Sequence, residues 1–222
     1  MSVKTLAVLL AASFSAIAGP VTIVSVLGGS GGCLCSLSGT QPDYVSWMQT
    51  GTFTGVTVQA DLGEIPDDVS DATGVAYLTN QVGTGTTQAT NGQAAPFNID
   101  ITNTTAALTT LFSGLTLGPG TYYLTINLTD DALGWEGFNF SPASTVTTAS
   151  GVTANPIGEC FGGTLGSCTP ASYPPASATF TTKASGILLY QVTGTASGVP
   201  EPATAGLMLA GLGIGALLLR KR

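Results

Sequence analysis

Alternation of threonine with apolar residues constrains the fold of this 222-residue chain more than any other feature. Side chains of a β-strand point alternately to the two faces of a sheet, so a period of two indicates strands with one buried face. We expect strands at Thr52–Leu62, Gly74–Val82, Phe97–Ile101, Thr121–Thr129, Ala178–Lys183 and Ile187–Thr193. A helical turn is expected only at Ala106–Phe112. The pattern therefore predicts an all-β protein, an antiparallel β-sandwich of the jelly-roll type.

Turn-forming residues separate the predicted strands. They are Gly83-Thr84-Gly85, Asn91-Gly92, Gly118-Pro119-Gly120 and Pro174-Pro175. The strand after Gly120 reads Thr121-Tyr122-Tyr123-Leu124 and resembles one found in many secreted bacterial sandwich domains. This resemblance supports the fold and implies nothing about a ligand.

The N-terminal residues have the features of a signal peptide. Lys4 precedes an apolar segment from Leu6 to Ile17, which closes on the small-x-small sequence Ala16-Ile17-Ala18. We therefore expect residues 1–18 to be removed after Ala18 and the remainder to be exported.

The C-terminal residues have three parts in a fixed order. Pro200, Glu201 and Pro202 come first, an uncharged run from Ala203 to Leu219 follows, and Arg220, Lys221 and Arg222 end the chain. The prolines favour extended backbone that a protease can reach. A helix of 17 residues is about 26 Å long, just short of a hydrocarbon core of about 30 Å. We expect one transmembrane helix at 203–219, with the basic residues left on the cytoplasmic side as a stop.

This order of motif, helix and basic cluster resembles the PEP-CTERM sorting signal, which is recognised by exosortase, a membrane-embedded protease of the cysteine type. The resemblance implies a Gram-negative host with an extracellular polysaccharide matrix, and a precursor anchored in the inner membrane that is later moved to the cell surface or released. The chain is then a signal peptide (1–18), a sandwich domain (19–193), a flexible spacer (194–199) and a sorting signal (200–222). The signal covers about a tenth of the chain and leaves the role of the sandwich open.

The charge of the predicted domain excludes one class of function. The chain has twelve acidic residues, of which only Glu201 lies outside this domain, and Lys183 is the domain's single basic residue. Eleven acids against one base give a net charge near −10, so the domain cannot neutralise phosphates and nucleic-acid binding is not expected.

The chain contains no histidine, which removes the commonest general base and the Ser-His-Asp and Cys-His hydrolases. A glycosidase with two carboxylates is the remaining enzymatic alternative. Its candidate acids are Asp130, Asp131, Glu136 and Glu159, with Trp135 and Phe138 to stack on a sugar. Solvated loops explain the same acids, and we expect a protein that is not an enzyme.

Four cysteines in an exported chain predict disulfides. We favour a bond between Cys160 and Cys168, because the seven residues between them form a glycine-rich loop. Such a bond contributes roughly 2.5 kcal/mol. A bond between Cys33 and Cys35 would be strained, and pairing of these two with Cys160 and Cys168 stays open. A metal site of four thiolates is less expected outside the cell.

Five acidic residues are candidate calcium ligands. They are Asp61, Glu64, Asp67, Asp68 and Asp71, in a spacing that fits no EF-hand. A solvated acidic loop is the alternative. Asn127, Asp130 and Asp131 are a second candidate group. Calcium is the only cofactor that the sequence suggests.

Flat aromatic side chains suggest carbohydrate binding, with Trp47 and the segment Trp135-Glu136-Gly137-Phe138 as candidates and core packing as the alternative. We predict a structural or binding role in an exopolysaccharide matrix. A calcium-dependent carbohydrate-binding adhesin is one alternative. An ice-binding surface protein is another, since some proteins with this type of tail carry that description, although regular T-x-T repeats are missing.

Overall fold

The computed structural model describes residues 19–28, 33–36, 42–64, 71–99, 106–128, 133–138, 145–159, 162–163, 166–167, 173–176, 180–183 and 187–197. Residues Pro20–Ser197 form one compact unit. The predicted signal peptide and sorting signal, and part of the predicted calcium and cysteine residues, lie outside the described residues.

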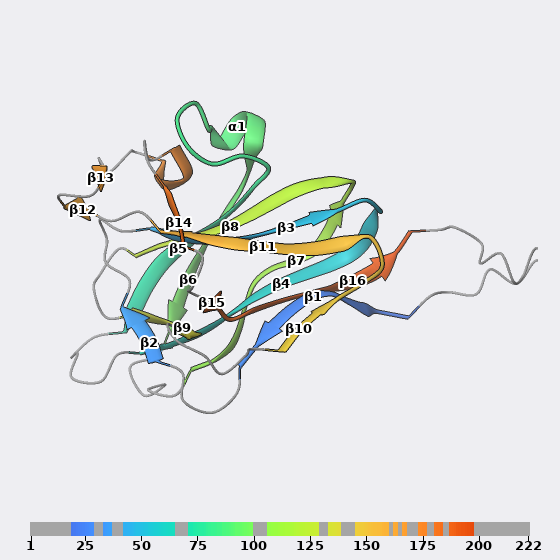
Figure 1. Cartoon of the computed structure of the whole chain (residues 1–222), viewed down its shortest axis with the longest axis horizontal. Coiled ribbons are helices and arrows are strands. Elements are labelled where there is room, and N and C mark those ends of the chain that lie inside the picture. The colour runs from blue at the N-terminus through green and yellow to red at the C-terminus, as the bar shows by residue number, and fades with distance from the viewer. Residues whose placement is uncertain are drawn as a thin grey trace, which may run out of the picture. The chain divides into compact units, whose positions relative to one another are not determined.

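Two antiparallel sheets make up the unit (Figure 1). Sheet I has the order β10 (Thr145–Thr148), β1 (Val21–Leu27), β16 (Tyr190–Ala196), β4 (Phe53–Glu64) and β7 (Ala107–Leu117). The end of β4 also pairs with β9 (Leu133–Phe138). β9 in turn pairs with β2 (Cys33–Ser36) and β15 (Ile187–Leu188). Sheet II has the order β14 (Thr181–Lys183), β11 (Val152–Glu159), β3 (Asp43–Gln49), β8 (Gly120–Leu128), β5 (Ala72–Thr79) and β6 (Gly92–Ile99). Smaller elements are α1 (Gln88–Asn91), η1 (Pro174–Ala176) and a hairpin of β12 (Gly162–Gly163) and β13 (Gly166–Ser167).

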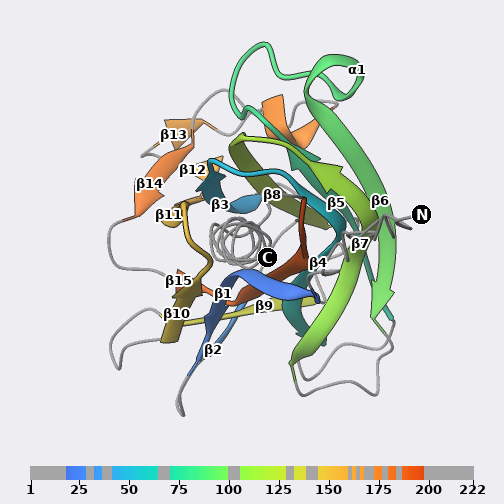
Figure 2. The same cartoon turned by 90° about the vertical axis from the view of Figure 1, so that its right-hand side faces the viewer.

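Seen end on, the two sheets face each other, and β6 and β7 lie side by side at one edge (Figure 2). The predicted all-β antiparallel sandwich is therefore confirmed.

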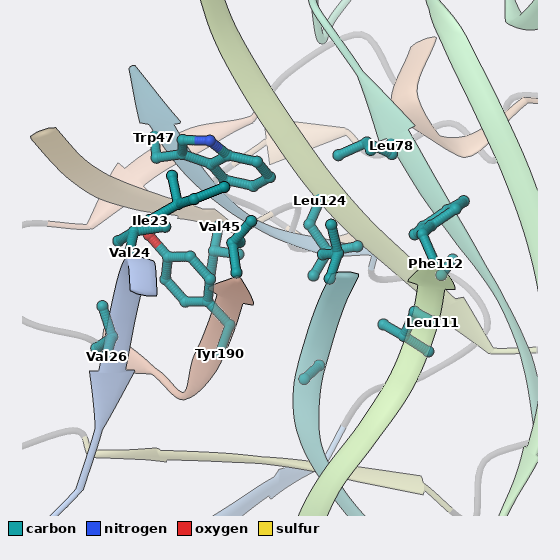
Figure 3. Packing of buried hydrophobic residues seen from close by; sticks show 14 of the residues in the cluster. Ile23, Val24, Val26, Val45, Trp47, Leu78, Leu111, Phe112, Leu124 and Tyr190 are labelled. Carbon is teal, nitrogen blue, oxygen red and sulfur yellow. The ribbon is translucent and has the colours of Figure 1, made fainter. Parts of the chain in front are cut away.

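The core fills the space between the sheets (Figure 3). Trp47 of sheet II stacks on Tyr122 with ring centroids 5.6 Å apart, and reaches Tyr190 of sheet I at 6.2 Å. Ile23, Val24 and Val192, together with Leu124 and Ile126, are fully buried. Alternate residues supply this layer in strands such as β4 and β8, as the period of two predicts, whereas a register shift in β1 allows the neighbours Ile23 and Val24 both to be buried.

Two sequence expectations about local structure are wrong. The segment 106–112 contains no helical turn but forms most of β7, which pairs with β4. The register shift between Val58, opposite Phe112, and Gln59, opposite Thr110, allows the neighbours Leu111 and Phe112 both to be buried, and consecutive apolar residues of this kind look helical in the sequence. Asn91 and Gly92 were expected among the turn residues between strands, but Asn91 ends α1 and Gly92 is already the first residue of β6.

Within the described residues, no helix is both long and apolar enough to cross a bilayer. The predicted helix 203–219 falls outside them.

Candidate functional site

The last strand of the fold leads directly to the sorting signal. In β16, Gly194 pairs with Val21 of β1, and Thr195 and Ala196 pair with Thr54 and Phe53 of β4. The backbone N–H of Ser197 donates to the carbonyl oxygen of Thr52 at 2.8 Å. Residues 194–196 were expected in the flexible spacer; the structure places them in the sheet, because both neighbouring strands offer them backbone partners.

Three tight turns lie at the same end of the sandwich as Ser197. They are residues 50–52 between β3 and β4, 118–119 between β7 and β8, and 149–151 between β10 and β11. Thr50 N donates to the carbonyl oxygen of Gly151 at 3.0 Å and so joins two of the turns. The expected turn at Gly118-Pro119-Gly120 is confirmed. We call this end, with Ser197 and the start of β1, the tail end.

Gln49 holds the tail end together from inside. Its side chain is 1% exposed. The Trp47 indole Nε1 donates to Gln49 Oε1 at 3.1 Å, and Gln49 Nε2 donates to the carbonyl oxygens of Leu117 and Gly118, both at 3.0 Å. Tyr122 OH also donates to Gly118 O, at 2.9 Å. The sequence analysis missed this network, although a Trp-x-Gln spacing in a strand places both side chains on one face.

Every charged residue that the structure describes belongs to the other half of the sandwich, whose extremity we call the acidic end. Asp43 begins β3, Glu64 ends β4, Asp71 immediately precedes β5, and Glu159 ends β11 opposite Asp43. The remaining described charged residues are Asp61 of β4, Glu136 of β9 and Lys183 of β14. Asp67, Asp68, Asp100, Asp130 and Asp131 lie outside the described residues.

The predicted calcium ligands are only partly placed. Asp61 belongs to sheet I, and its backbone N–H donates to the carbonyl oxygen of Leu189 at 3.0 Å. Asp71 is exposed just before a strand of sheet II, and Glu64 is the final residue of β4. Among the described residues, no three acidic or cysteine side chains form a group that could hold a metal ion. Calcium binding by Asp61, Glu64, Asp67, Asp68 and Asp71 stays a prediction.

Both tryptophans are core residues. Trp47 and Trp135 each have an exposed fraction of 0%. Trp135 Nε1 donates to the carbonyl oxygen of Leu189 at 2.9 Å, so the indole N–H is satisfied inside the protein. Neither ring can stack on a sugar at the surface, and the alternative of core packing holds for both.

A second aromatic cluster covers the outer face of sheet II. Tyr44 contacts Tyr123 and Phe180 edge to face, and Tyr77 contacts Tyr173 in the same way at 5.0 Å. Burial raises the pKa of Tyr77 and of Tyr173 above 10.0. The segment that carries Tyr173 and Phe180 thus covers the face with aromatic contacts, so the cluster serves packing.

The cysteines are placed only through their surroundings. Cys33 and Cys35 lie in β2, opposite Gly137 and Trp135 of β9. Cys160 and Cys168 lie outside the described residues, but the hairpin between them pairs Gly162 with Ser167. Gly162 comes two residues after Cys160 and Ser167 directly precedes Cys168, so this pairing is compatible with the predicted bond. The bond itself stays a prediction.

The outer face of sheet I carries hydroxyl and amide side chains. Gln59 Nε2 donates to Thr110 Oγ1 at 3.2 Å, and Gln191 Nε2 donates to Ser25 Oγ at 3.4 Å. Gln59 and Gln191 lie directly opposite each other in the pairing of β4 with β16, and Thr57 and Thr193 form the next pair on the same face. The centre of this face is polar and uncharged.

Residues 198–222 match the family model of the PEP-CTERM protein-sorting motif. The chain therefore carries a PEP-CTERM sorting motif, and this signal implies export and processing at a membrane by an exosortase. No curated protein and no solved structure shows significant similarity to the chain.

Proposed function

We propose that this protein is an envelope protein that exosortase cuts at Pro200-Glu201-Pro202, and that its sandwich then takes a structural or binding role in an exopolysaccharide matrix. The observation that carries the proposal is the sorting motif at 198–222, which begins at the residue after the last described residue of the fold, Ser197. The precursor is held in the inner membrane by the helix 203–219. The role is not enzymatic, which the lack of histidine supports.

Replacement of Glu201 tests the processing step. Wild-type protein recovered from the native host should lack all residues after the motif, whereas Glu201→Ala should retain Arg222 and accumulate in the inner membrane. Glu136→Ala, outside the motif, is the matched control and should be processed normally. Mass spectrometry of the C-terminus gives the result. A wild-type protein that keeps Arg222 at its destination would show that the tail is only an anchor.

The outer face of sheet I supports the binding role. Hydroxyl and amide groups exchange hydrogen bonds with sugar hydroxyls, and the uncharged centre of this face, with Asp61 to one side of it, repels an acidic polysaccharide less than the acidic end does. The double variant Gln59→Ala/Gln191→Ala should weaken co-sedimentation of the protein with exopolysaccharide from the host. Asn80→Ala, which removes an exposed amide outside this face, is the control. Equal binding by all three proteins would assign the binding to another surface.

Calcium is proposed as an accessory at the acidic end rather than as the basis of function. Titration with calcium should raise the melting temperature of the wild type but not of Asp61→Asn if Asp61, Glu64, Asp67, Asp68 and Asp71 bind it. An equal change of the melting temperature in both proteins would contradict calcium binding by these residues and would favour the alternative of a solvated acidic loop.

A further inference from the structure

We propose that the tail end of the sandwich is a contact surface for phospholipid headgroups, so that the precursor stands on the membrane with its acidic end turned away. This inference rests on the proposed membrane-held precursor and adds which surface of the domain meets the bilayer.

The length of chain between the fold and the membrane carries the first step. Ser197 is fixed to Thr52 at the end of sheet I. The uncharged run begins at Ala203, six residues later, and such a segment spans at most about 22 Å. Part of that length must cross the headgroup layer, which is roughly 5–8 Å deep on each side of a bilayer. The tail end therefore stays close to the lipid surface whenever the tail is inserted.

The N-terminal part of the chain is attached to the same end of the sandwich as the tail. Val21 begins β1 and pairs with Gly194 of β16, so the chain enters and leaves the fold at the same place (Figure 1). The predicted signal peptide is joined to this same end, through Gly19 and Pro20. Both hydrophobic segments of the precursor would draw the same surface toward the membrane.

Charge makes this surface suited to lipid. None of the described residues of the tail end is charged: its turns consist of residues 50–52, 118–119 and 149–151, all glycine, proline, alanine, serine or threonine. The nearest described carboxylates are far along the strands. Asp43 is six residues from Gln49, which is about 20 Å, and Asp61 is eight residues from Phe53, about 26 Å. Both distances exceed the Debye length of about 8 Å, so anionic headgroups would scarcely repel these acids in the upright orientation.

Two of the three exposed large apolar side chains that the structure describes lie near the same end, whereas Val146 pairs with Val26, farther along β1. Among the described residues, the large apolar side chains exposed to solvent are Val21, Met48 and Val146. Val21 begins β1 at the tail end, and Met48 precedes Gln49, opposite Thr121 of β8. A surface with hydroxyls, backbone turns and isolated apolar side chains fits the boundary between water and lipid, where a layer of carboxylates would not.

The test measures which end of the domain lies near lipid. The full chain is reconstituted in nanodiscs of phosphatidylcholine and phosphatidylglycerol that carry a gadolinium-chelating lipid, and the relaxation enhancement of methyl groups is read by NMR. Val21 and Met48 should relax at least about tenfold faster than Leu62 and Ile126, because about 20 Å of strand separates the two ends. Equal enhancement at both ends, with the chain in the nanodiscs, would overturn the proposed orientation and leave the proposed function intact.

Two matched variants test the role of charge. Ser150→Asp adds an acid to an exposed turn of the tail end, and Ala107→Asp adds one to an exposed position of β7 opposite Leu62 at the acidic end. Ser150→Asp should lower the contrast between the ends severalfold in anionic nanodiscs, and Ala107→Asp should leave it unchanged. Equal behaviour of the two variants would overturn the electrostatic argument.

Two other results have distinct meanings. A chain that does not enter the nanodiscs would refute the membrane-held precursor and this proposal with it. A contrast that appears only after the sorting protease is added to the nanodiscs would overturn lipid contact and identify the tail end as a protein-binding surface.

Discussion

Gln49 gives the sharpest test of how the sandwich is held together, because its buried amide serves both the core and the turn at the tail end. Gln49→Leu keeps the approximate volume of the side chain and removes its polar atoms. The Trp47 indole N–H then loses its acceptor and Leu117 O loses this donor, whereas Gly118 O keeps Tyr122. Gly51 O, which also accepts from Gln49 Nε2 at 3.2 Å, belongs to an exposed residue and can bond to water instead. A buried polar group without a partner costs about 1–3 kcal/mol, so two of them give about 2–6 kcal/mol, and we expect a loss near 3 kcal/mol.

Thermal unfolding measures this loss. For a domain of this size, each kcal/mol lowers Tm by about 2–4 °C, so Gln49→Leu should lower Tm by about 6–12 °C. Gln59→Leu is the matched control, since Gln59 makes one side-chain hydrogen bond on the outer face of sheet I, to Thr110, and its loss should stay within about 0.5 kcal/mol. Tm is followed by near-ultraviolet circular dichroism of the purified chain in mild detergent. Equal shifts in the two variants, or a Tm of Gln49→Leu within about 2 °C of wild type, would refute the assigned role of the network.

Two further predictions concern pH and backbone packing. Burial raises the pKa of Tyr190, Tyr77, Tyr122 and Tyr173, so these tyrosines keep their protons in the folded state at a pH where the unfolded chain loses them. The resulting stability is complete below pH 10 and is lost as the pH rises further. Urea unfolding at pH 9 and pH 11 should show this fall in the free energy of unfolding, and Tyr190→Phe should make the fall shallower. An equal fall in wild type and variant would contradict the raised pKa assigned to Tyr190. Gly92→Ala should lower the free energy of unfolding by about 2 kcal/mol, because a Cβ at Gly92 would meet the backbone oxygen of Leu78 and the side chain of Thr79. A Cβ at Gly118 would meet no atom within 4 Å, so Gly118→Ala should leave the stability unchanged. Chemical denaturation compares the two glycine variants, and equal midpoints would show that β6 moves to accommodate the methyl group.

The sequence predicts the parts of this molecule in which a local pattern determines the structure. The alternation around Thr57, Val58 and Gln59 identifies β4 because successive side chains of that stretch point in turn to the outer face of the sheet and to the core. The sorting signal is recognisable for a related reason, since a sorting enzyme must recognise it as a linear motif.

Other parts depend on partners that are distant in sequence. β3 reads Asp43-Tyr44-Val45-Ser46-Trp47-Met48-Gln49, and its polar Gln49 is buried only because the turn after Leu117 offers it acceptors. The burial of Trp135 likewise requires Leu189 O, which comes 54 residues later in the chain. The separation of charge between the two ends depends on which strand ends meet. It therefore becomes visible only when the strand order is known.

The position of β16 links folding to export. This strand is the last of the fold, yet it lies between β1 and β4 in sheet I, and it contributes Tyr190 and Val192 to the core. The first strand therefore has no partner on one edge until residue 196 has crossed the membrane, and contacts between residues so distant in sequence form slowly. Because Ser197 is followed at once by the sorting motif, the sandwich can close only when almost all of the chain before the expected membrane segment has been translocated. The sorting enzyme then meets a domain that has already folded, with its uncharged end beside the motif that is to be cut.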